Sequence, residues 1–368
     1  MFACSPQKDD ETQKGDVTLL PKENFTANVD GKEISLYTLE AGDVTMQVTN
    51  FGGRVVSIWA PDREGRLADV VLGYEHIDRY LNNEGERFLG AVVGRYANRI
   101  ARGRFSIDGV DYQVAPWSNG QCLHGGENSF DMKVWDVVEA TPTKLVLSYV
   151  SPDMEDGFPG ELTTVMTYSL SDDNAFKIEY EATTDKPTVV NFTNHSFFNL
   201  KGEGAGSIED HVMTIRASHV TTVDSVLIPT GEIASVEGTP LDFRTPVVIG
   251  DRIESDFMQM VYGSGYDHNY ILDKSADGAV ELAATVYEPM SGRLMEVWTD
   301  QPAMQFYSGN HFPGTVCGKG ASKHIRRESL ALETQKYPDS PNQPSFPTTT
   351  LRPGETYRQT CIYKFGVK

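Results

Sequence analysis

Short strand-like segments separated by turn residues run from about residue 23 to the end of the sequence, and they constrain the fold more than any other feature. In the first hairpin, residues 43–50 alternate apolar and polar side chains, 51–53 carry two glycines, and 54–60 return as a second strand. Helical periodicity is nearly absent and is plausible only over 248–260. This pattern predicts an all-β protein, and we expect one large antiparallel β-sandwich with few short helices.

The other strands are expected at regular intervals along the chain. We place them at 69–73, 104–115, 134–150, 162–183, 188–200, 211–217, 282–289, 292–299, 303–308 and 358–365, of which 104–115, 134–150 and 162–183 are hairpins. One helical turn is expected at 77–83. No linker, repeat or change of composition follows residue 22, so residues 23–368 are predicted to form a single domain.

Acidic residues outnumber basic ones in this chain. Its 368 residues include 52 Asp and Glu against 32 Lys and Arg, which gives a formal net charge of −20. Nucleic acids and anionic membrane surfaces are bound through basic patches, so neither is an expected partner. A neutral small molecule is a better match for this charge. No apolar run reaches the roughly 18 residues of a membrane-spanning helix.

Residues 1–22 are predicted to be a flexible leader. Ala3, Cys4 and Ser5, followed by a charged tether, resemble the mature start of a bacterial lipoprotein. Two readings stay open. Either an upstream signal was removed and Cys4 carries a lipid anchor at the cell envelope or periplasm, or Cys4 is incidental and the protein is cytoplasmic. The other three cysteines form no C-x-x-C pair, so we expect free thiols and no zinc site.

The segment 330–342, LALETQKYPDSPN, places a carboxylate where its apolar run predicts another buried side chain. Strand parity puts Glu333 on one face and Leu330 and Leu332 on the other, so the leucines are expected in the core and the carboxylate in a cleft. A buried carboxylate is costly unless it is paired or used, and we expect it to act as a base. The alternative is an ordinary strand-end glutamate that faces solvent.

Two histidines have neighbours that suggest a binding site. His124 precedes Gly125 and Gly126, which would let a ligand or another backbone approach closely. His195 lies in VNFTNHSFFNL, and on a strand over 191–199 it would share one face with amide, hydroxyl and aromatic side chains. Such a face is typical of a carbohydrate cleft. The alternative is a core histidine that is satisfied by its amide and hydroxyl neighbours.

Four further polar residues are candidates for ligand contacts. Asp267 lies among aromatic residues in GYDHNY, where the alternative is a turn aspartate that caps its own backbone. Asn98 and Arg99 lie in GRYANRI, where the alternative is a solvated loop with surface salt bridges. Gln305 interrupts the aromatic strand MQFY, where the alternative is a solvent-facing position. His311 follows this strand and is expected in a loop, away from the cleft rim.

Together these segments form an ordered set of motifs. They are NFGGRVVSIWAPDREG, GRYANRIARGRF, LHGG, NHSFFNL, GYDHNY, MQFYSGN and LETQKYPDSPN. From about Phe25 to the C-terminus, the chain resembles the aldose 1-epimerases (galactose mutarotases). NHSFFNL and LETQKYPDSPN are the most specific of these motifs. The resemblance implies a large antiparallel β-sandwich, in agreement with the strand pattern.

The resemblance also implies a reaction and roles for the candidate residues. The family interconverts the α and β anomers of a free aldose by ring opening, rotation about the C1–C2 bond and reclosure. Glu333 would be the base that removes the anomeric proton, and His195 the acid that protonates the ring oxygen. Sugar binding would fall to the other five residues, which are Asn98, Arg99, His124, Asp267 and Gln305. No metal or other cofactor is implied.

Two other functions remain open from the sequence. A non-catalytic sugar-binding sandwich of the cell envelope would bind sugars without accelerating the anomer exchange. A hexose-6-phosphate 1-epimerase would need further arginines around the site, and the sequence shows no such cluster.

Overall fold

The computed structural model of the chain describes residues 17–368. Cys4 and most of the predicted leader lie outside this range, so the lipid anchor stays a prediction. The backbone N–H of Leu20 donates to Oε1 of Gln47 (2.8 Å), and its carbonyl accepts from Nε2 of the same residue (3.1 Å). Contacts with the domain therefore extend back into the range 1–22. No helix within the described range is long and apolar enough to cross a membrane.

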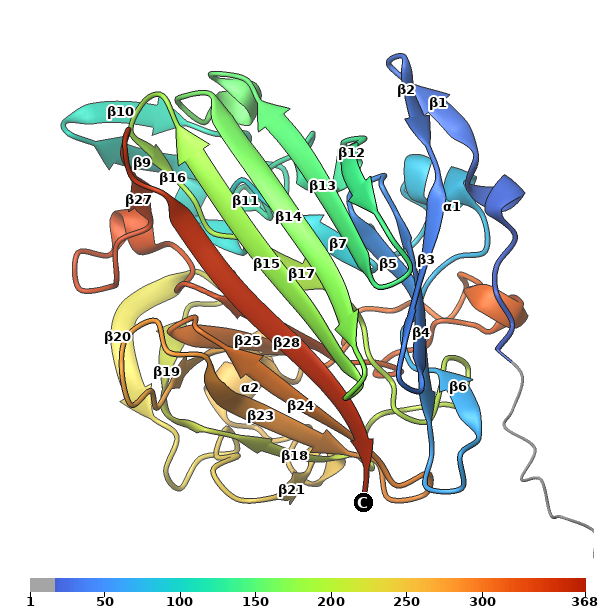
Figure 1. Ribbon diagram of the computed structural model, residues 1–368. Coiled ribbons are helices and arrows are strands. Elements are labelled where there is room, and N and C mark those ends of the chain that lie inside the picture. Colours follow the sequence, from blue (N-terminus) through green and yellow to red (C-terminus); the bar gives the residue numbers. More distant parts are fainter. Residues whose placement is uncertain (1–16) are drawn as a thin grey trace, which may run out of the picture.

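Most strands belong to three antiparallel sheets (Figure 1). The first has nine strands, in the order β12 (Asp136–Ala140), β13 (Lys144–Ser151), β14 (Leu162–Ser171), β15 (Ala175–Thr184), β28 (Tyr357–Val367), β24 (Arg293–Thr299), β23 (Glu281–Tyr287), β18 (Val212–Ile215) and β21 (Val247–Val248). The second has five strands, in the order β20 (Pro229–Ser235), β19 (Ala217–Val223), β22 (Asp267–Leu272), β25 (Ala303–Tyr307) and β26 (Ala331–Gln335). The third has four strands, in the order β3 (Leu36–Ala41), β4 (Val44–Thr49), β5 (Arg54–Pro61) and β6 (Leu67–Asp69).

The remaining elements are short. Paired strands are β1 (Ala27–Val29) with β2 (Lys32–Ile34), β9 (Arg104–Ile107) with β10 (Val110–Gln113), β8 (Arg99–Ile100) with β11 (Cys122–Leu123), β16 (Thr188–Val189) with β27 (Thr350–Leu351), and β7 (Ala91–Val93) with β17 (Thr193–His195). The α-helices within residues 17–368 are α1 (Ile77–Leu81) and α2 (Met258–Gly263). Single 3₁₀ turns occupy Lys22–Phe25, Ala101–Gly103, Phe130–Met132, Glu155–Gly157, Ile249–Asp251, Lys319–Ala321 and Ser340–Asn342.

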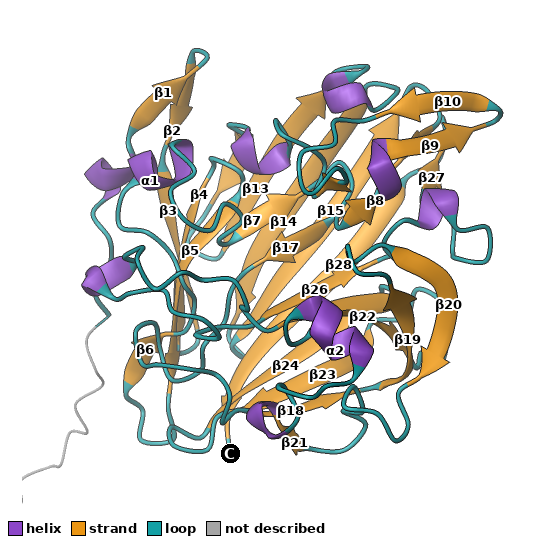
Figure 2. Ribbon diagram, turned by 180° about the vertical axis from the view of Figure 1, so that it is seen from behind, coloured by secondary structure: helices purple, strands orange, loops and turns teal. Residues whose placement is uncertain are grey.

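The smaller sheets pack on the inner face of the nine-stranded sheet. Along β14, buried side chains alternate with exposed or half-buried ones, as expected for a strand with one face in the core. One core cluster joins Met166 and Tyr168 of β14 to Met46 of β4, Phe306 of β25 and Leu332 of β26. Figure 2, from behind, shows the five-stranded sheet in front of the long strands. The predicted all-β sandwich with few short helices is confirmed.

The helix predicted over 248–260 is wrong. Val247 and Val248 instead pair with β18, a 3₁₀ turn follows, and α2 begins only at Met258. Ile249, Ile253 and Met260 are buried at intervals that imitate a helical face. Their side chains turn inward from a 3₁₀ turn, a loop and a short helix, so the apolar spacing came from tertiary packing and not from one helix.

The strand predicted over 188–200 is broken into two pieces. β16 ends at Val189 and pairs with β27, whereas β17 covers Thr193–His195 and pairs with β7. Phe198 then forms an isolated bridge to Leu330. The chain therefore changes partners twice in this region, and a single shared face over 191–199 does not exist.

A buried charged cluster ties the segment after β25 to the four-stranded sheet. Nζ of Lys319 lies 2.9 Å from Oδ2 of Asp69 and 3.2 Å from Oε2 of Glu203, and the lysine side chain is only 9% exposed. The ammonium also donates to the carbonyl of Val71 (3.0 Å), and Oε1 of Glu203 lies 2.7 Å from Nε2 of His324. Removing the ammonium would leave two buried carboxylates without their cation.

Replacing Lys319 by methionine is therefore expected to lower the free energy of unfolding by about 3–5 kcal/mol. Urea denaturation followed by circular dichroism measures the change. Lys364→Met is the matched control, because that lysine pairs with Asp173 at 2.7 Å on the surface, with side chains 41% and 60% exposed. The control should cost less than about 1 kcal/mol. Equal losses in the two variants would show that the buried cluster does not stabilise the fold.

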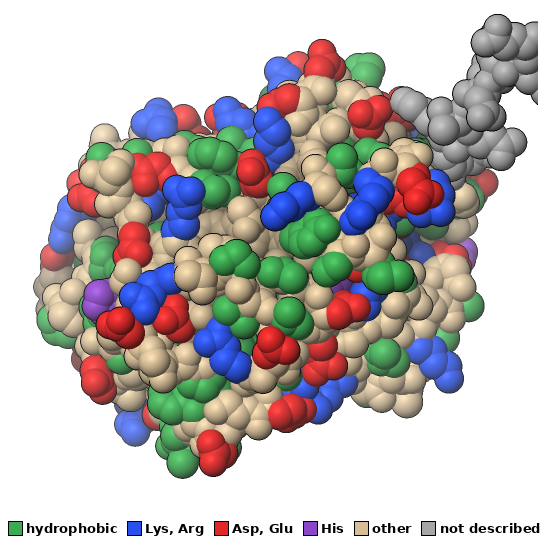
Figure 3. All heavy atoms as spheres, turned by 90° about the horizontal axis from the view of Figure 1, so that it is seen from below, with side chains coloured by type: hydrophobic (Ala, Val, Ile, Leu, Met, Phe, Trp, Pro, Cys, Tyr) green, Lys and Arg blue, Asp and Glu red, His purple; other side chains and the backbone are tan. Residues whose placement is uncertain are grey.

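The surface seen from below mixes both signs of charge (Figure 3). Lysine and arginine side chains are interspersed with aspartate and glutamate on this face, which carries no continuous basic patch among the residues described. The expectation that nucleic acid is not a partner stays a prediction.

Candidate active site

Glu333 lies in the middle of β26, at the edge of the five-stranded sheet. Leu330 and Leu332 belong to the main core cluster, whereas the Glu333 side chain lines a cavity of about 310 Å³. The hydroxyl of Tyr363 on β28 donates to the carbonyl of Leu332 (2.8 Å), which fixes the strand against the large sheet. The division predicted from strand parity is confirmed: the leucines anchor the strand and the carboxylate faces the cavity.

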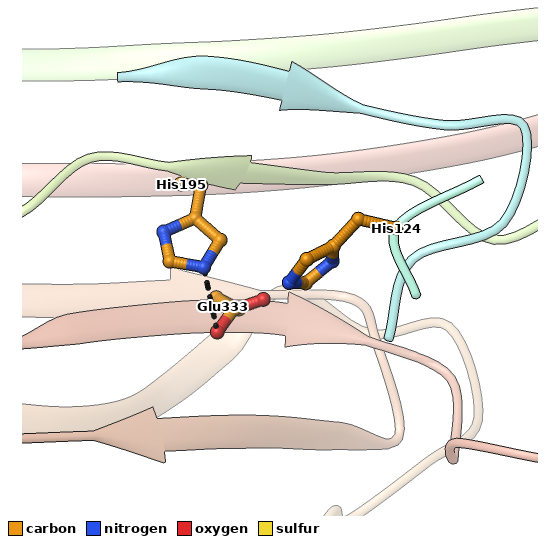
Figure 4. A group of neighbouring side chains, drawn as sticks. All are labelled: His124, His195 and Glu333. Carbon is orange, nitrogen blue, oxygen red and sulfur yellow. Dashed lines mark ion pairs between the residues drawn. The ribbon is translucent and has the colours of Figure 1, made fainter. Parts of the chain in front are cut away.

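His195 ends β17 and reaches the same carboxylate. The strand pairs with β7, so that His195 lies opposite Ala91. Nε2 of His195 is 3.5 Å from Oε1 of Glu333, and the two side chains are 6% and 3% exposed (Figure 4). The rings of Phe88 and Phe197 lie 6.0 Å and 4.8 Å from the imidazole. This pair of ionisable groups is therefore enclosed by apolar side chains at the floor of the cavity.

His124 reaches the cavity from the short ladder of β8 and β11. Its ring centre lies 5.1 Å from that of His195, at an interplanar angle of 86°, and 4.6 Å from that of Phe88. Its Nδ1 accepts a hydrogen bond from the backbone N–H of Asn98 (3.2 Å). Figure 4 shows both imidazoles pointing toward the Glu333 carboxylate.

A second charged pair lies beside these groups. Nη2 of Arg99 is 3.7 Å from Oδ2 of Asp267, and Nε2 of Gln305 donates to Oδ1 of Asp267 (2.6 Å). Six of the residues predicted for the site line the cavity, namely Asn98, Arg99, His124, His195, Asp267 and Glu333. Gln305 lies behind the lining and holds Asp267. All seven predicted residues are therefore neighbours in the structure, although they lie on segments as far apart in the sequence as β8 and β26.

Comparison with known proteins identifies the family. The family model described as aldose 1-epimerase matches residues 35–364, which is most of the chain. The chain belongs to the aldose 1-epimerase family. It is 41% identical to galactose mutarotase from Bos taurus over 334 residues, which cover 91% of this chain and 94% of that protein. It is 37% identical to aldose 1-epimerase from Escherichia coli (strain K12) over 340 residues, which cover 91% and 96%.

Solved structures agree with this assignment. A GalM/aldose epimerase homologue from C. elegans superposes with a TM-score of 0.83 at 28% identity, covering 91% of this chain and 99% of that one. A galactose 1-epimerase from Lactobacillus acidophilus NCFM superposes with a TM-score of 0.79 at 28% identity, covering 93% and 97%. The predicted family is confirmed, and as its member the chain is an isomerase.

Burial shifts three titratable groups in the cavity of this epimerase. Loss of hydration, and then the charge of Asp267, raise the pKa of Glu333 well above its usual range, although Arg99 opposes them. Burial lowers the pKa of His195 to about 4, although Asp267 opposes it. Burial, followed by the charges of His195 and Arg99, lowers the pKa of His124 well below 6.5. Near neutral pH, both imidazoles of the free protein are therefore neutral, and burial favours the protonated form of Glu333.

The same three side chains also form a group that could suit a metal ion. His124, His195 and Glu333 each offer one ligand atom, and these atoms lie within 4.8 Å of one another (Figure 4). Two imidazoles and a carboxylate are a frequent ligand set for transition metals. The expectation of no metal site therefore stays a prediction, and the reaction proposed below uses none.

Sequence reasoning did not assign several other residues that line the epimerase cavity. They are Gly85, Glu86, Arg87, Phe88, Trp117, Leu123 and Tyr307. Arg87 is held by Asp131, with Nε 2.8 Å from Oδ2, and its guanidinium lies 4.8 Å from the Trp117 ring. His311 lies in a turn, as predicted, but it also lines the cavity, which corrects its expected place away from the rim.

Proposed function

We propose that this chain interconverts the α and β anomers of free aldoses such as glucose and galactose, with Glu333 as base and His195 as acid. The observation that carries the proposal is the buried Glu333–His195 pair, 3.5 Å apart, at the floor of a cavity of about 310 Å³. Two groups at this distance can serve the two oxygens of one hemiacetal carbon, which is the requirement of the reaction.

The proton transfers balance within the pair. The Glu333 carboxylate takes the proton of the anomeric hydroxyl, whose O–H electrons form the C1=O bond. The C1–O5 bond breaks, and O5 receives a proton from the His195 imidazolium. Rotation about C1–C2 then presents the other face of the aldehyde to O5. In reclosure His195 takes the O5 proton and Glu333 returns one to O1, so the enzyme ends as it began.

The pair must hold one proton for this cycle, and the proton must move. In the free protein, burial favours the protonated carboxyl of Glu333 and the neutral imidazole of His195. For Glu333 to act as a base, the proton must pass to His195, which lies at 3.5 Å. Arg99 favours the Glu333 carboxylate and Asp267 favours the His195 imidazolium. We infer that sugar hydroxyls, by solvating the carboxylate, complete this transfer on binding.

The pH profile of kcat/KM tests this proton count. A second proton enters the pair on His195, whose pKa is lowered to about 4, so the acidic limb should lie near pH 4. Activity should be nearly constant from there to neutral pH and fall only on the alkaline side, where the pair loses its remaining proton. Circular dichroism at each pH controls for unfolding. An acidic limb near the ordinary histidine value of 6.5 would contradict the burial of this pair.

Asp267 and Arg99 are proposed to bind sugar hydroxyls, together with Asn98, His124 and Gln305. Asp267→Asn should raise KM about 10–100-fold with a smaller effect on kcat, because a hydrogen bond to a charged group is lost in ground and transition states alike. Asp173→Asn, an exposed aspartate outside the cavity, should leave KM unchanged. A fall in kcat at unchanged KM would assign Asp267 to the chemistry instead.

The cavity favours neutral sugars over sugar phosphates. Both arginines that line it are already paired with carboxylates, Arg99 with Asp267 and Arg87 with Asp131. A phosphate would have to compete with these partners while facing Glu86 and Glu333, which also line the cavity. We expect fresh α-D-glucose to be epimerised with a higher kcat/KM than α-D-glucose 6-phosphate. The opposite ranking would favour the hexose-6-phosphate epimerase.

A further inference from the structure

The backbone around His124 determines which of its ring nitrogens carries a proton. Beyond the end of the β8–β11 ladder, Asn98 and His124 face each other, with φ angles of 65° and 53° in the left-handed region. The backbone N–H of His124 donates to the carbonyl of Asn98 (3.0 Å), and the backbone N–H of Asn98 donates to Nδ1 of His124 (3.2 Å). One residue thus holds both the backbone and the ring of His124.

This contact admits a single protonation state. A backbone N–H only donates, so Nδ1 must present its lone pair, and the one proton of the neutral ring must be on Nε2. An imidazolium would place a second donor against the Asn98 N–H. Among the neighbouring titratable and charged groups, His195, Arg99 and Arg87 also disfavour a charged ring, whereas a Glu333 carboxylate, within 4.8 Å, would favour one. Near neutral pH, His124 can therefore offer the cavity only an Nε2–H donor.

In contrast to His124, His195 is not held in one protonation state by its contacts. Its Nδ1 has no hydrogen-bond partner among residues 17–368, and its Nε2 lies 3.5 Å from Glu333. No backbone N–H of a described residue donates to either ring nitrogen, so neither is held as an acceptor, and the ring can gain and lose a proton. The two histidines, with ring centres 5.1 Å apart, are therefore chemically distinct.

We propose that His124 is a fixed, neutral Nε2–H donor that keeps its proton throughout turnover, and that the backbone N–H of Asn98 is the positioning group that holds this tautomer. The donor would stabilise negative charge that develops on a sugar oxygen in the cavity, while His195 supplies the proton. This assignment rests on the proposed function. It also makes His124 a poor metal ligand, since its cavity-facing nitrogen has no free lone pair.

Two-bond ¹H–¹⁵N correlation spectra of the full chain, labelled at histidine nitrogen, test the tautomer directly. Loss of signals in His124→Gln assigns the ring. In the wild type we expect an unprotonated Nδ1 and a protonated Nε2 from about pH 5 to about pH 9. A proton on Nδ1, or a titration of this ring near 6.5, would overturn the proposal. The experiment requires no turnover, so its outcome is independent of the proposed function.

Two substitutions of His124 separate a donor from a proton carrier. Glutamine places an amide N–H near the position of Nε2, whereas asparagine is too short to do so. A donor role predicts that kcat of His124→Gln exceeds that of His124→Asn by at least about 10-fold. Equal losses of about 10³-fold in both variants would mean that the ring transfers a proton, and would overturn the proposal. If the wild type does not epimerise aldoses, the proposed function fails and the spectra still decide the tautomer.

Discussion

Replacing Glu333 by glutamine is expected to lower kcat for anomer interconversion by about 10³-fold, which is the usual contribution of a general base. Glutamine keeps the shape of the side chain but cannot accept the anomeric proton. Burial raises the pKa of Glu333 and so favours its neutral form, which the amide of glutamine resembles in charge and shape. The melting temperature should therefore stay close to that of the wild type. Polarimetry and thermal unfolding measure the two effects.

Glu328→Gln is the matched control for this variant. Glu328 is 1% exposed, and its two oxygens accept the backbone N–H groups of Gly204 (2.8 Å) and Ile325 (3.0 Å). In Glu328→Gln, the side-chain NH₂ group would face one of these backbone N–H groups, and two donors cannot form a hydrogen bond. The free energy of unfolding should therefore fall by about 1–3 kcal/mol, while the folded protein keeps its kcat. If Glu333→Gln shows the same pattern as this control, Glu333 is structural and is not the base.

Replacing His195 by asparagine should also lower kcat by about 10³-fold, because the ring oxygen loses its proton donor. Phe88 and Phe197 enclose the position, so the loss of ring contacts adds a decrease in stability, which thermal unfolding separates from the kinetic effect. His219→Asn, at an exposed histidine outside the cavity, should keep wild-type kcat.

The double variant of Glu333→Gln and His195→Asn adds a sharper outcome. If the two groups act as one proton-transfer unit, kcat of the double variant should be close to that of either single variant, because the unit is already broken. Losses that multiply to about 10⁶-fold would mean that the two groups act independently. Wild-type kcat in either single variant would contradict the assigned roles.

Local patterns in the sequence predicted much of this fold. The alternation over 43–50 and the glycine turn after it form the β4–β5 hairpin, and Asp108-Gly109 forms the turn between β9 and β10. Such signals depend only on a few neighbouring residues, so they can be recognised without knowledge of the tertiary structure. Strand parity likewise placed Glu333 opposite its leucine neighbours. The resemblance of the ordered motifs to the aldose 1-epimerases then assigned residues that are far apart in the sequence to one site.

Features that depend on distant segments were not predicted. Residues 217–223, 229–235 and 267–272 are strands of the five-stranded sheet, although their residue patterns gave no clear strand signal. The cavity-lining segment from Glu86 to Phe88 lies in a loop, and contacts with distant residues such as Asp131, Trp117 and His195 place it beside the site. A polar loop of this kind carries no periodicity from which its position could be read.

The protonation states also required the structure. The shifts of Glu333 and His195 are caused first by burial, and this burial is produced by β7, β17 and β26 together. The pairing of β17 with β7, about 100 residues earlier in the sequence, cannot be deduced from one segment. The contact between Asn98 and Nδ1 of His124 is of the same kind, since it depends on both residues adopting left-handed backbone angles.

The most direct test of the central claim is the optical rotation of freshly dissolved α-D-galactose, followed with wild-type protein and with Glu333→Gln at equal concentration. The account predicts that the wild type accelerates the approach to equilibrium in proportion to its concentration, whereas the variant retains about 10⁻³ of that rate. A wild-type protein that binds the sugar but leaves the rate at that of buffer would contradict the account and leave the non-catalytic sugar-binding protein as the better description.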